Sequence, residues 1–189
     1  MRGKIPRIRI EDYPAVKAHL DLYWSKISKR ADKGDTPYNL RNCAYLEDFD
    51  KPKVIYMEIQ TDNPNEGYPF PCFSYDDTNA VVLNTAYIMC SHTVDVRYIL
   101  GILNSKLGKF LVKMYVTQLQ ERQFRMLAQY TNRFPIPKIS AEQMGKITEL
   151  VELEINSHSD DTETDIDDIV FNIFGLNENE IKHVKDREV

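Results

Sequence analysis

Apolar side chains recur at helical spacing in two stretches of the N-terminal two thirds of the chain. Within residues 14–30 the apolar positions share one helical face, and Pro14 suits the first helical position. Within residues 95–114 a longer apolar stripe is interrupted by the polar run Asn104-Ser105-Lys106. We therefore predict a helix over residues 14–30 and a second helix over residues 95–114 with a tight polar break inside it.

Helical patterns also dominate the end of the chain. Ser140 with Gln143 three residues later forms a capping-box pattern, which predicts a helix over residues 141–156. Residues 156–165 are rich in Ser, Asp, Thr and Glu, and Asp160–Asp165 offers no apolar side chain to bury, so we expect a mobile acidic linker there. Two short helices, over residues 167–174 and 178–185, are expected to close the chain.

The middle of the chain has the alternation and β-branched content of strands. The candidates are residues 53–59, 70–75 and 80–90, which are separated by segments containing Pro, Gly and Asn. Strands followed by helices predict an α+β fold, with a small twisted β-sheet packed with helices and followed by a C-terminal helical tail. We place the domain boundary at residue 140, which gives an α+β domain over residues 1–140 and a helical acidic tail over residues 141–189.

Charge is distributed unevenly along the 189 residues. Residues 1–138 contain 20 Lys and Arg against 15 Asp and Glu, whereas residues 139–189 contain 4 against 14. The body is therefore mildly basic although the whole chain has a formal net charge of −5, and a nucleic-acid partner is compatible with this body. Three scattered cysteines favour free thiols and a reducing compartment, and no apolar run reaches membrane-spanning length. We expect a cytoplasmic protein with no membrane partner.

The local motifs of the common catalytic sites are missing from the sequence. The chain contains no Pro-Pro pair of the kind that grips a flipped base in DNA methyltransferases, and no Gly-x-Gly turn for a cofactor. Cys90 and His92 lack a second pair at zinc spacing. We therefore assign no catalytic, cofactor-binding or metal-binding residue. A hydrolase remains an alternative, because the nucleophile and base of a hydrolase can lie far apart in the sequence and meet only in the folded protein.

Five short segments, taken in order, resemble one family. The segments are Tyr38-x-Leu40-Arg41-x-Cys43-x-Tyr45, Lys51-Pro-Lys53-Val-Ile-Tyr56, Asn84-Thr85-Ala86-Tyr87-Ile88, Leu103-Asn-Ser-Lys106 and Phe134-Pro-Ile-Pro137. With these segments, the N-terminal two thirds is similar to the TaqI-like C-terminal specificity domain, the target-recognition module of restriction–modification enzymes, and fainter similarity extends to type I specificity subunits.

This resemblance implies that residues 1–140 are a DNA target-recognition domain, which recognises a double-stranded DNA sequence and performs no chemistry. It further implies that the chain is the C-terminal fragment of a type IIG-like adenine-specific methyltransferase. The methyltransferase domain would precede Met1 and bind S-adenosylmethionine, and the parent chain could also carry an endonuclease. The alternative is a domain of a type I or phage-defence methylase assembly, in which the helix that begins after Ser140 docks another subunit.

Residues 118–133 concentrate the side chains that read DNA bases. Arg donates two hydrogen bonds to guanine, and Gln makes two with adenine, donating to N7 and accepting from the N6 amino group. An ordinary solvated surface is the alternative reading of this segment. Lys106 and Lys109, beside the polar break, are candidates for phosphate contacts. The predicted DNA-binding residues are Lys106, Lys109, Gln118, Gln120, Arg122, Gln123, Arg125, Asn132 and Arg133.

Overall fold

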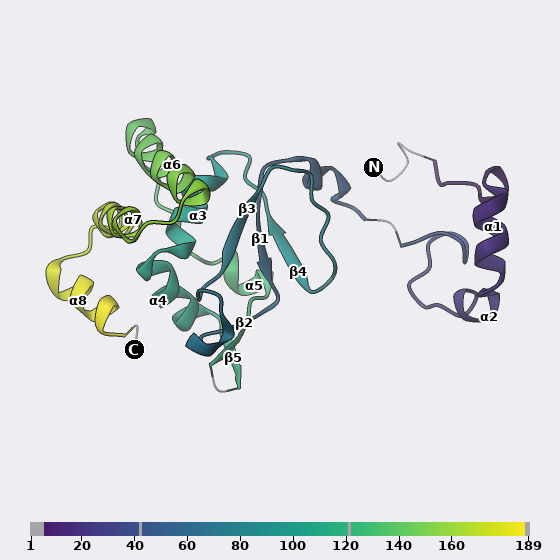
Figure 1. Cartoon of the computed structure of the whole chain (residues 1–189), viewed down its shortest axis with the longest axis horizontal. Helices are drawn as coiled ribbons and strands as arrows, with labels where there is room; N and C mark the ends of the chain where they lie inside the picture. The colour runs from purple at the N-terminus through teal and green to yellow at the C-terminus, as the bar shows by residue number, and fades with distance from the viewer. Residues whose placement is uncertain (1–5, 42, 121, 188–189) are drawn as a thin grey trace. The chain divides into compact units, whose positions relative to one another are not determined.

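The computed structural model describes residues 6–41, 43–120 and 122–187, which fall into two compact units, Met1–Glu47 and Asp48–Val189 (Figure 1). In the first unit, the short 3₁₀ helix η1 (Ile10–Asp12) precedes α1 (Pro14–Asp21) and α2 (Trp24–Ile27). The single helix predicted over residues 14–30 is therefore wrong, because the chain leaves the helical conformation between α1 and α2. Trp24 is 45% exposed, so the apolar face of this segment is only partly covered within its own unit.

The second unit is built around two small antiparallel sheets. The first sheet has the order β3–β1–β4, formed by Phe73–Asp76, Lys53–Met57 and Ala86–Met89. The second has the order β2–β6–β5, formed by Ile59–Thr61, Gln123–Arg125 and Thr117–Gln120. Together with the helices they form the α+β fold that the sequence predicts, with two sheets in place of one.

Glu58 separates the two sheets. Its backbone N–H donates to the carbonyl of Thr85 at 2.9 Å, and its carbonyl accepts from the N–H of Met126 at 2.7 Å. The predicted strand over residues 53–59 therefore bends at Glu58 and enters the second sheet as β2. The strand predicted over residues 80–90 shortens to Ala86–Met89, because the residues before it form an irregular loop that contains Asn79 at φ 62°.

The long helical segment after the first sheet is broken where the sequence predicts. Helix α3 (Val96–Asn104) ends at Ser105, and α4 (Lys106–Tyr115) begins there. The Ser105 hydroxyl accepts from the N–H of Gly108 at 3.1 Å and donates to the carbonyl of Ile102 at 2.7 Å, so one side chain joins the two helices. Asn104 bonds both backbone groups of Phe73, at 2.9 and 3.1 Å, and so fixes the end of α3 to β3.

The C-terminal helices pack on α3 and α4 (Figure 1). Helix α6 (Ala141–Asn156) begins at the predicted capping box of Ser140 and Gln143. Helix α7 (Asp160–Ile173) follows after three residues, and α8 (Glu178–Asp186) begins at a second capping box. The core between these layers includes Ile102, Val112, Ile147 and Val170, all fully buried.

The predicted acidic linker is wrong for Asp160–Asp165, which form the first turns of α7. Acidic residues at a helix N-terminus interact favourably with the helix dipole. The buried side chains of Ile166 and Val170 then hold the helix against the core. The non-helical connection is therefore limited to residues 157–159. The domain boundary proposed at residue 140 stays a prediction, and the chain also divides after Glu47.

Candidate nucleic-acid interface

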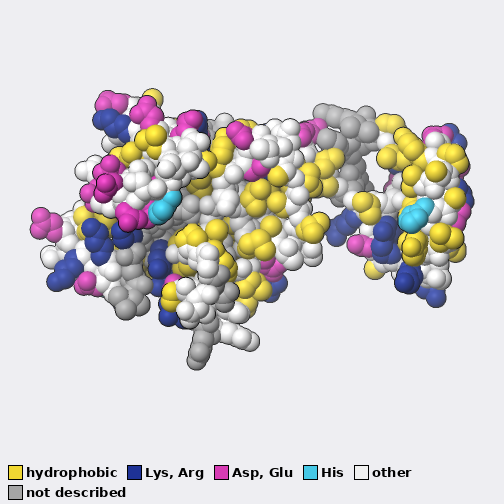
Figure 2. Space-filling model, viewed as in Figure 1, with side chains coloured by type: hydrophobic (Ala, Val, Ile, Leu, Met, Phe, Trp, Pro, Cys, Tyr) yellow, Lys and Arg dark blue, Asp and Glu magenta, His cyan; other side chains and the backbone are white. Residues whose placement is uncertain are grey.

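The hairpin formed by β5 and β6 protrudes from the second unit. Short α5 (Ala128–Thr131) follows the hairpin. All four residues of β5 are exposed, and β5 is an edge strand paired only with β6 among the described strands. On β6, the buried Phe124 packs at 5.0 Å from Phe70, measured between ring centroids, and anchors the base of the hairpin. Figure 2 shows the hairpin standing out from the body with mainly uncharged side chains. An exposed two-stranded ribbon of this kind fits the DNA major groove.

The hairpin holds five of the predicted DNA-binding residues. Gln118 and Gln120 are exposed on β5, where the Gln118 side chain donates to the carbonyl of Gln120 at 3.2 Å. Gln123 is half-buried at the start of β6, directly opposite Gln120. The remaining two are Arg122, in the turn, and Arg125, on β6. Gln118 and Gln120 therefore lie on the free edge strand of the hairpin, and Gln123 lies on the central strand β6.

Arg122 belongs to a cluster of charges at one side of the hairpin, which we name the Asp62 cluster. Its members are Asp62, Lys109, Lys113 and Arg122. Asp62 Oδ2 lies 2.8 Å from Lys113 Nζ, and Asp62 Oδ1 lies 3.7 Å from both Lys109 Nζ and Arg122 Nη2. Three cations thus share one carboxylate, so the cluster carries a net positive charge beside the hairpin. Lys and Arg side chains gather at this side of the hairpin base in Figure 2.

The Asp62 carboxylate is only 13% exposed. Burial disfavours its ionised form, but the hydrogen bond from Lys113 and the charges of Lys109, Lys113 and Arg122 outweigh burial and lower the pKa of Asp62. Asp62 therefore stays ionised at neutral pH and holds the three cations in place.

Arg125 and Arg133 are held by other partners. Arg125 Nη2 lies 2.8 Å from Glu58 Oε1, so this guanidinium is paired on the surface of the second sheet. Arg133, just beyond α5, lies with its guanidinium carbon 5.8 Å from the centre of the Tyr115 ring. Asn132 is exposed at the end of α5. These groups extend the polar surface from the hairpin towards the end of α4, which α5 contacts.

Lys106 faces a different part of the molecule. Its Nζ lies 2.8 Å from Oδ2 of Asp167 on α7, and its backbone N–H donates to Oδ1 of the same carboxylate at 2.8 Å. Asp167 is buried, with a side chain 5% exposed. The structure therefore places Lys106 at the contact between α4 and α7, where it stabilises the packing of the C-terminal helices. It is not part of the Asp62 cluster.

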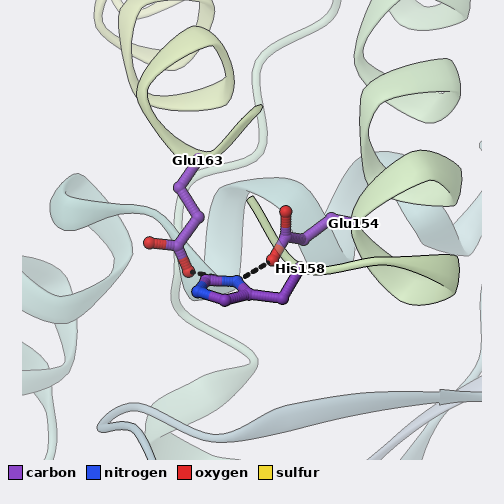
Figure 3. A group of neighbouring side chains, drawn as sticks. All are labelled: Glu154, His158 and Glu163. Atoms are coloured by element: carbon purple, nitrogen blue, oxygen red, sulfur yellow. Dashed lines mark hydrogen bonds and ion pairs between the residues drawn. The ribbon is translucent and has the colours of Figure 1, made fainter. Parts of the chain in front are cut away.

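Lys106 and Lys109 also line a cleft of about 800 Å³ within the second unit. Aromatic and proline side chains from the segment leading into β3 form one wall, and α6 and α7 contribute a wall rich in Glu, His and Asp. Glu154, His158 and Glu163 meet at this acidic wall (Figure 3). One imidazole nitrogen and two carboxylate oxygens lie within 4.8 Å of one another there.

The His158 imidazole pairs with both carboxylates. His158 Nδ1 contacts Glu154 Oε1 and lies 3.7 Å from Glu163 Oε1 (Figure 3). The hydrogen bond and charge of Glu154 raise the pKa of His158, which strengthens an ion pair between the end of α6 and the start of α7. His158 is 65% exposed, and we assign this group the role of joining the two helices.

Sequence reasoning missed two members of the Asp62 cluster. Lys113 follows Lys109 by four residues, so both lie on one face of α4, and this spacing was a signal that could have found it. Asp62 gave no such signal, because it is 47 residues from Lys109 and its role depends on packing between distant segments.

The hairpin, α4 and α5 lie within a region that matches a known family. Residues 5–136 match the model of the TaqI-like C-terminal specificity domain. The chain belongs to this family. This confirms the resemblance found in the sequence, and it makes the chain a specificity module of the kind that serves restriction–modification methyltransferases. Every predicted DNA-binding residue of this TaqI-like specificity domain lies inside the match, whereas α6, α7 and α8 lie outside it. Within the described residues, no helix is long and apolar enough to cross a membrane.

Proposed function

We propose that the chain recognises a specific double-stranded DNA sequence, with the β5–β6 hairpin in the major groove and the Asp62 cluster beside the phosphate backbone. The observation that carries this proposal is the pairing of an exposed, glutamine-bearing ribbon with a net positive cluster at its side. Amides at the edge of a ribbon supply direct base readout, and neighbouring cations fix its register on phosphates.

Within this proposal the residues have different roles. Gln118, Gln120 and Gln123 are candidates for base contacts, since they lie on the two strands of the hairpin. Lys109, Lys113 and Arg122 contact phosphates. Arg125, Asn132 and Arg133 flank the hairpin and remain candidates for contacts at its edges.

The family membership also supports a proposal about the parent protein. The module would belong to a type IIG-like methyltransferase that methylates adenine at N6, with the methyltransferase domain as its partner and S-adenosylmethionine bound there. The specificity module holds the duplex while the methyltransferase domain receives the flipped base. The chain itself would then have no methyl-transfer activity.

Selection of bound duplexes from a random library, by the 189-residue chain at low salt, tests the proposal. We expect one enriched sequence motif, and an affinity that falls linearly with the logarithm of salt concentration. Gln120→Ala should cost roughly 1–3 kcal/mol on the selected sequence and little on random DNA. Lys113→Ala should weaken both equally and reduce the salt slope by about 0.9.

Asn172→Ala, which removes an exposed amide from α7, is the control and should change neither quantity. Recovery of no motif, with affinity independent of salt, would refute DNA recognition by this chain.

A second candidate function concerns α6, where the Leu153 side chain is 59% exposed. This exposed apolar side chain favours docking of another subunit in a type I or phage-defence methylase assembly. Light scattering on the purified chain tests it, because a stable dimer that is lost in Leu153→Glu would support docking through α6. A monomer at all concentrations would count against self-association.

A further inference from the structure

Asp62 has contacts that tie the turn of the hairpin to α4. Its backbone N–H donates to the carbonyl of Arg122 at 2.7 Å, and its backbone carbonyl accepts from Nε of Arg122. Its carboxylate meets Lys113 at 2.8 Å and Lys109 at 3.7 Å, both on α4. One residue therefore joins three elements: the segment after β2, the turn of the hairpin and the face of α4.

The turn needs this support. Arg122 has φ 61°, a left-handed conformation that is uncommon for residues other than glycine. Among the described strands, the hairpin's one partner is the three-residue strand β2, which pairs with β6, so the second sheet offers few hydrogen bonds to hold the far end of the hairpin. The contacts of Asp62 supply the missing restraint, and its buried charge offsets the repulsion among three neighbouring cations.

We infer that Asp62 is a positioning residue that determines specificity: it fixes the hairpin in the orientation that reads bases, and it lowers the attraction of the surface for DNA of any sequence. Asp62 touches no base in this scheme, since its carboxylate is enclosed by its own cations. A carboxylate beside a phosphate-binding surface weakens total affinity. A carboxylate at this position has a use if it orders the hairpin. The inference rests on the proposed function, because only a DNA-reading hairpin gives this order a use.

Asp62→Asn separates the two effects, because the amide keeps the size of the side chain and removes its charge. We expect the amides of residues 117–120 and 123–125 to exchange hydrogen at least tenfold faster, since Lys109, Lys113 and Arg122 then repel one another. Discrimination between the selected sequence and random DNA should fall about tenfold. Affinity for random DNA should rise, because the negative charge of Asp62 no longer opposes the phosphates that Lys109, Lys113 and Arg122 contact.

Asp168→Asn is the matched control, because it removes an exposed carboxylate from α7 and changes the net charge equally. It should alter neither hydrogen exchange in the hairpin nor discrimination between the selected sequence and random DNA.

Arg122→Gly is the second variant, and it tests the role of the Asp62–Arg122 contact if Asp62→Asn does not fold. Glycine accepts the left-handed conformation, so this change removes the guanidinium link while sparing the turn. It should also speed hairpin exchange and reduce discrimination, but random-DNA affinity should fall because a cation is lost.

The outcomes are distinguishable. Equal exchange and equal discrimination in Asp62→Asn and Asp168→Asn would overturn the inference. If the wild-type chain selects no sequence, the proposed function fails, and with it the role in discrimination. Hydrogen exchange, measured without DNA, separately decides whether Asp62 orders the hairpin.

Discussion

Substitution of alanine for each of three helical glycines should change the free energy of unfolding by amounts that differ in sign. Gly108 lies in the first turn of α4, where an added Cβ would stand 2.3 Å from the carbonyl oxygens of Ile102 and Leu103. Gly101 lies in α3, where a Cβ would meet methyl groups of Val151 and Ile147 at 2.9 and 3.0 Å. At Gly145, in α6, no heavy atom other than those of its chain neighbours and its own helix backbone lies within 4 Å of the position that a Cβ would take.

The magnitudes follow from what each methyl group meets. Alanine is favoured over glycine in a helix by about 1 kcal/mol, so Gly145→Ala should stabilise the protein by about that amount. Gly101→Ala has the same gain but overpacks two β-branched side chains, and a net loss of about 1 kcal/mol is expected. At Gly108 the obstacle is backbone, which cannot change rotamer, so α3 and α4 must separate at a cost of roughly 3 kcal/mol or more.

Thermal unfolding followed by far-ultraviolet circular dichroism tests this order. In a domain of this size about 1 kcal/mol shifts Tm by roughly 3 °C, so Gly145→Ala should raise Tm by about 3 °C and Gly108→Ala should lower it by about 10 °C. Urea unfolding at a fixed temperature provides a second measure of the same differences. If Gly108→Ala were as stable as the wild type, the close contact between α4 and the end of α3 would be wrong.

Further predictions concern the buried and exposed ion pairs. Lys53, fully buried, lies 2.5 Å from Asp76 across the β1–β3 pair, and Lys53→Met should destabilise by about 3 kcal/mol in urea unfolding because it leaves the carboxylate unpaired. Burial opposes ionisation of Asp76, but Lys53 and Thr78 lower its pKa to about 2 from the ordinary 3.8. This shift corresponds to roughly 2 kcal/mol of folding stability. The stabilisation should be present above pH 3.8 and lost as the pH falls through about 2. Asp76→Asn should show no further loss over that range. Glu154 raises the pKa of His158, so the stabilisation from this imidazole is complete below its unfolded pKa near 6.5 and is lost as the pH rises through the folded pKa. The Tm difference between wild type and His158→Gln should therefore be larger at pH 5.5 than at pH 8.5, and an equal difference would contradict the ion pair.

Local signals predicted the helical parts of the fold best. The break at Asn104-Ser105-Lys106 and the capping box at Ser140 depend on residues within one or two turns, so the sequence shows them directly. The division into two sheets depends on pairing of Ile59 with Arg125, which are 66 residues apart, and no local pattern reveals that pairing. Asp160–Asp165 were mistaken for a linker because acidic composition is shared by disordered segments and helix N-termini.

The candidate site was predicted by residue type more than by position. Residues 118–133 were rich in the right side chains, and the structure gathers Gln118, Gln120 and Gln123 on one hairpin. Charge pairing could not be foreseen, because it depends on which acids the fold brings near each base. Lys106 and Arg125 have acidic partners 61 and 67 residues away in sequence.

The boundary of the family match has a consequence for exchanging specificity between related proteins. The match ends at residue 136. The surface of α3 at Gly101 nevertheless packs against the side chains of Ile147, Val151 and Ile166, which lie beyond that boundary. The Tyr98 hydroxyl of α3 also donates to the carbonyl of Pro137. A chimaera joined at residue 136 would transplant α3 without the helices that cover it, and would rely on the recipient for a surface of matching shape. Crossover points after α8 would carry each hairpin together with α3, α4 and the C-terminal helices that pack on them, so such hybrids should inherit a working preference for sequence more often.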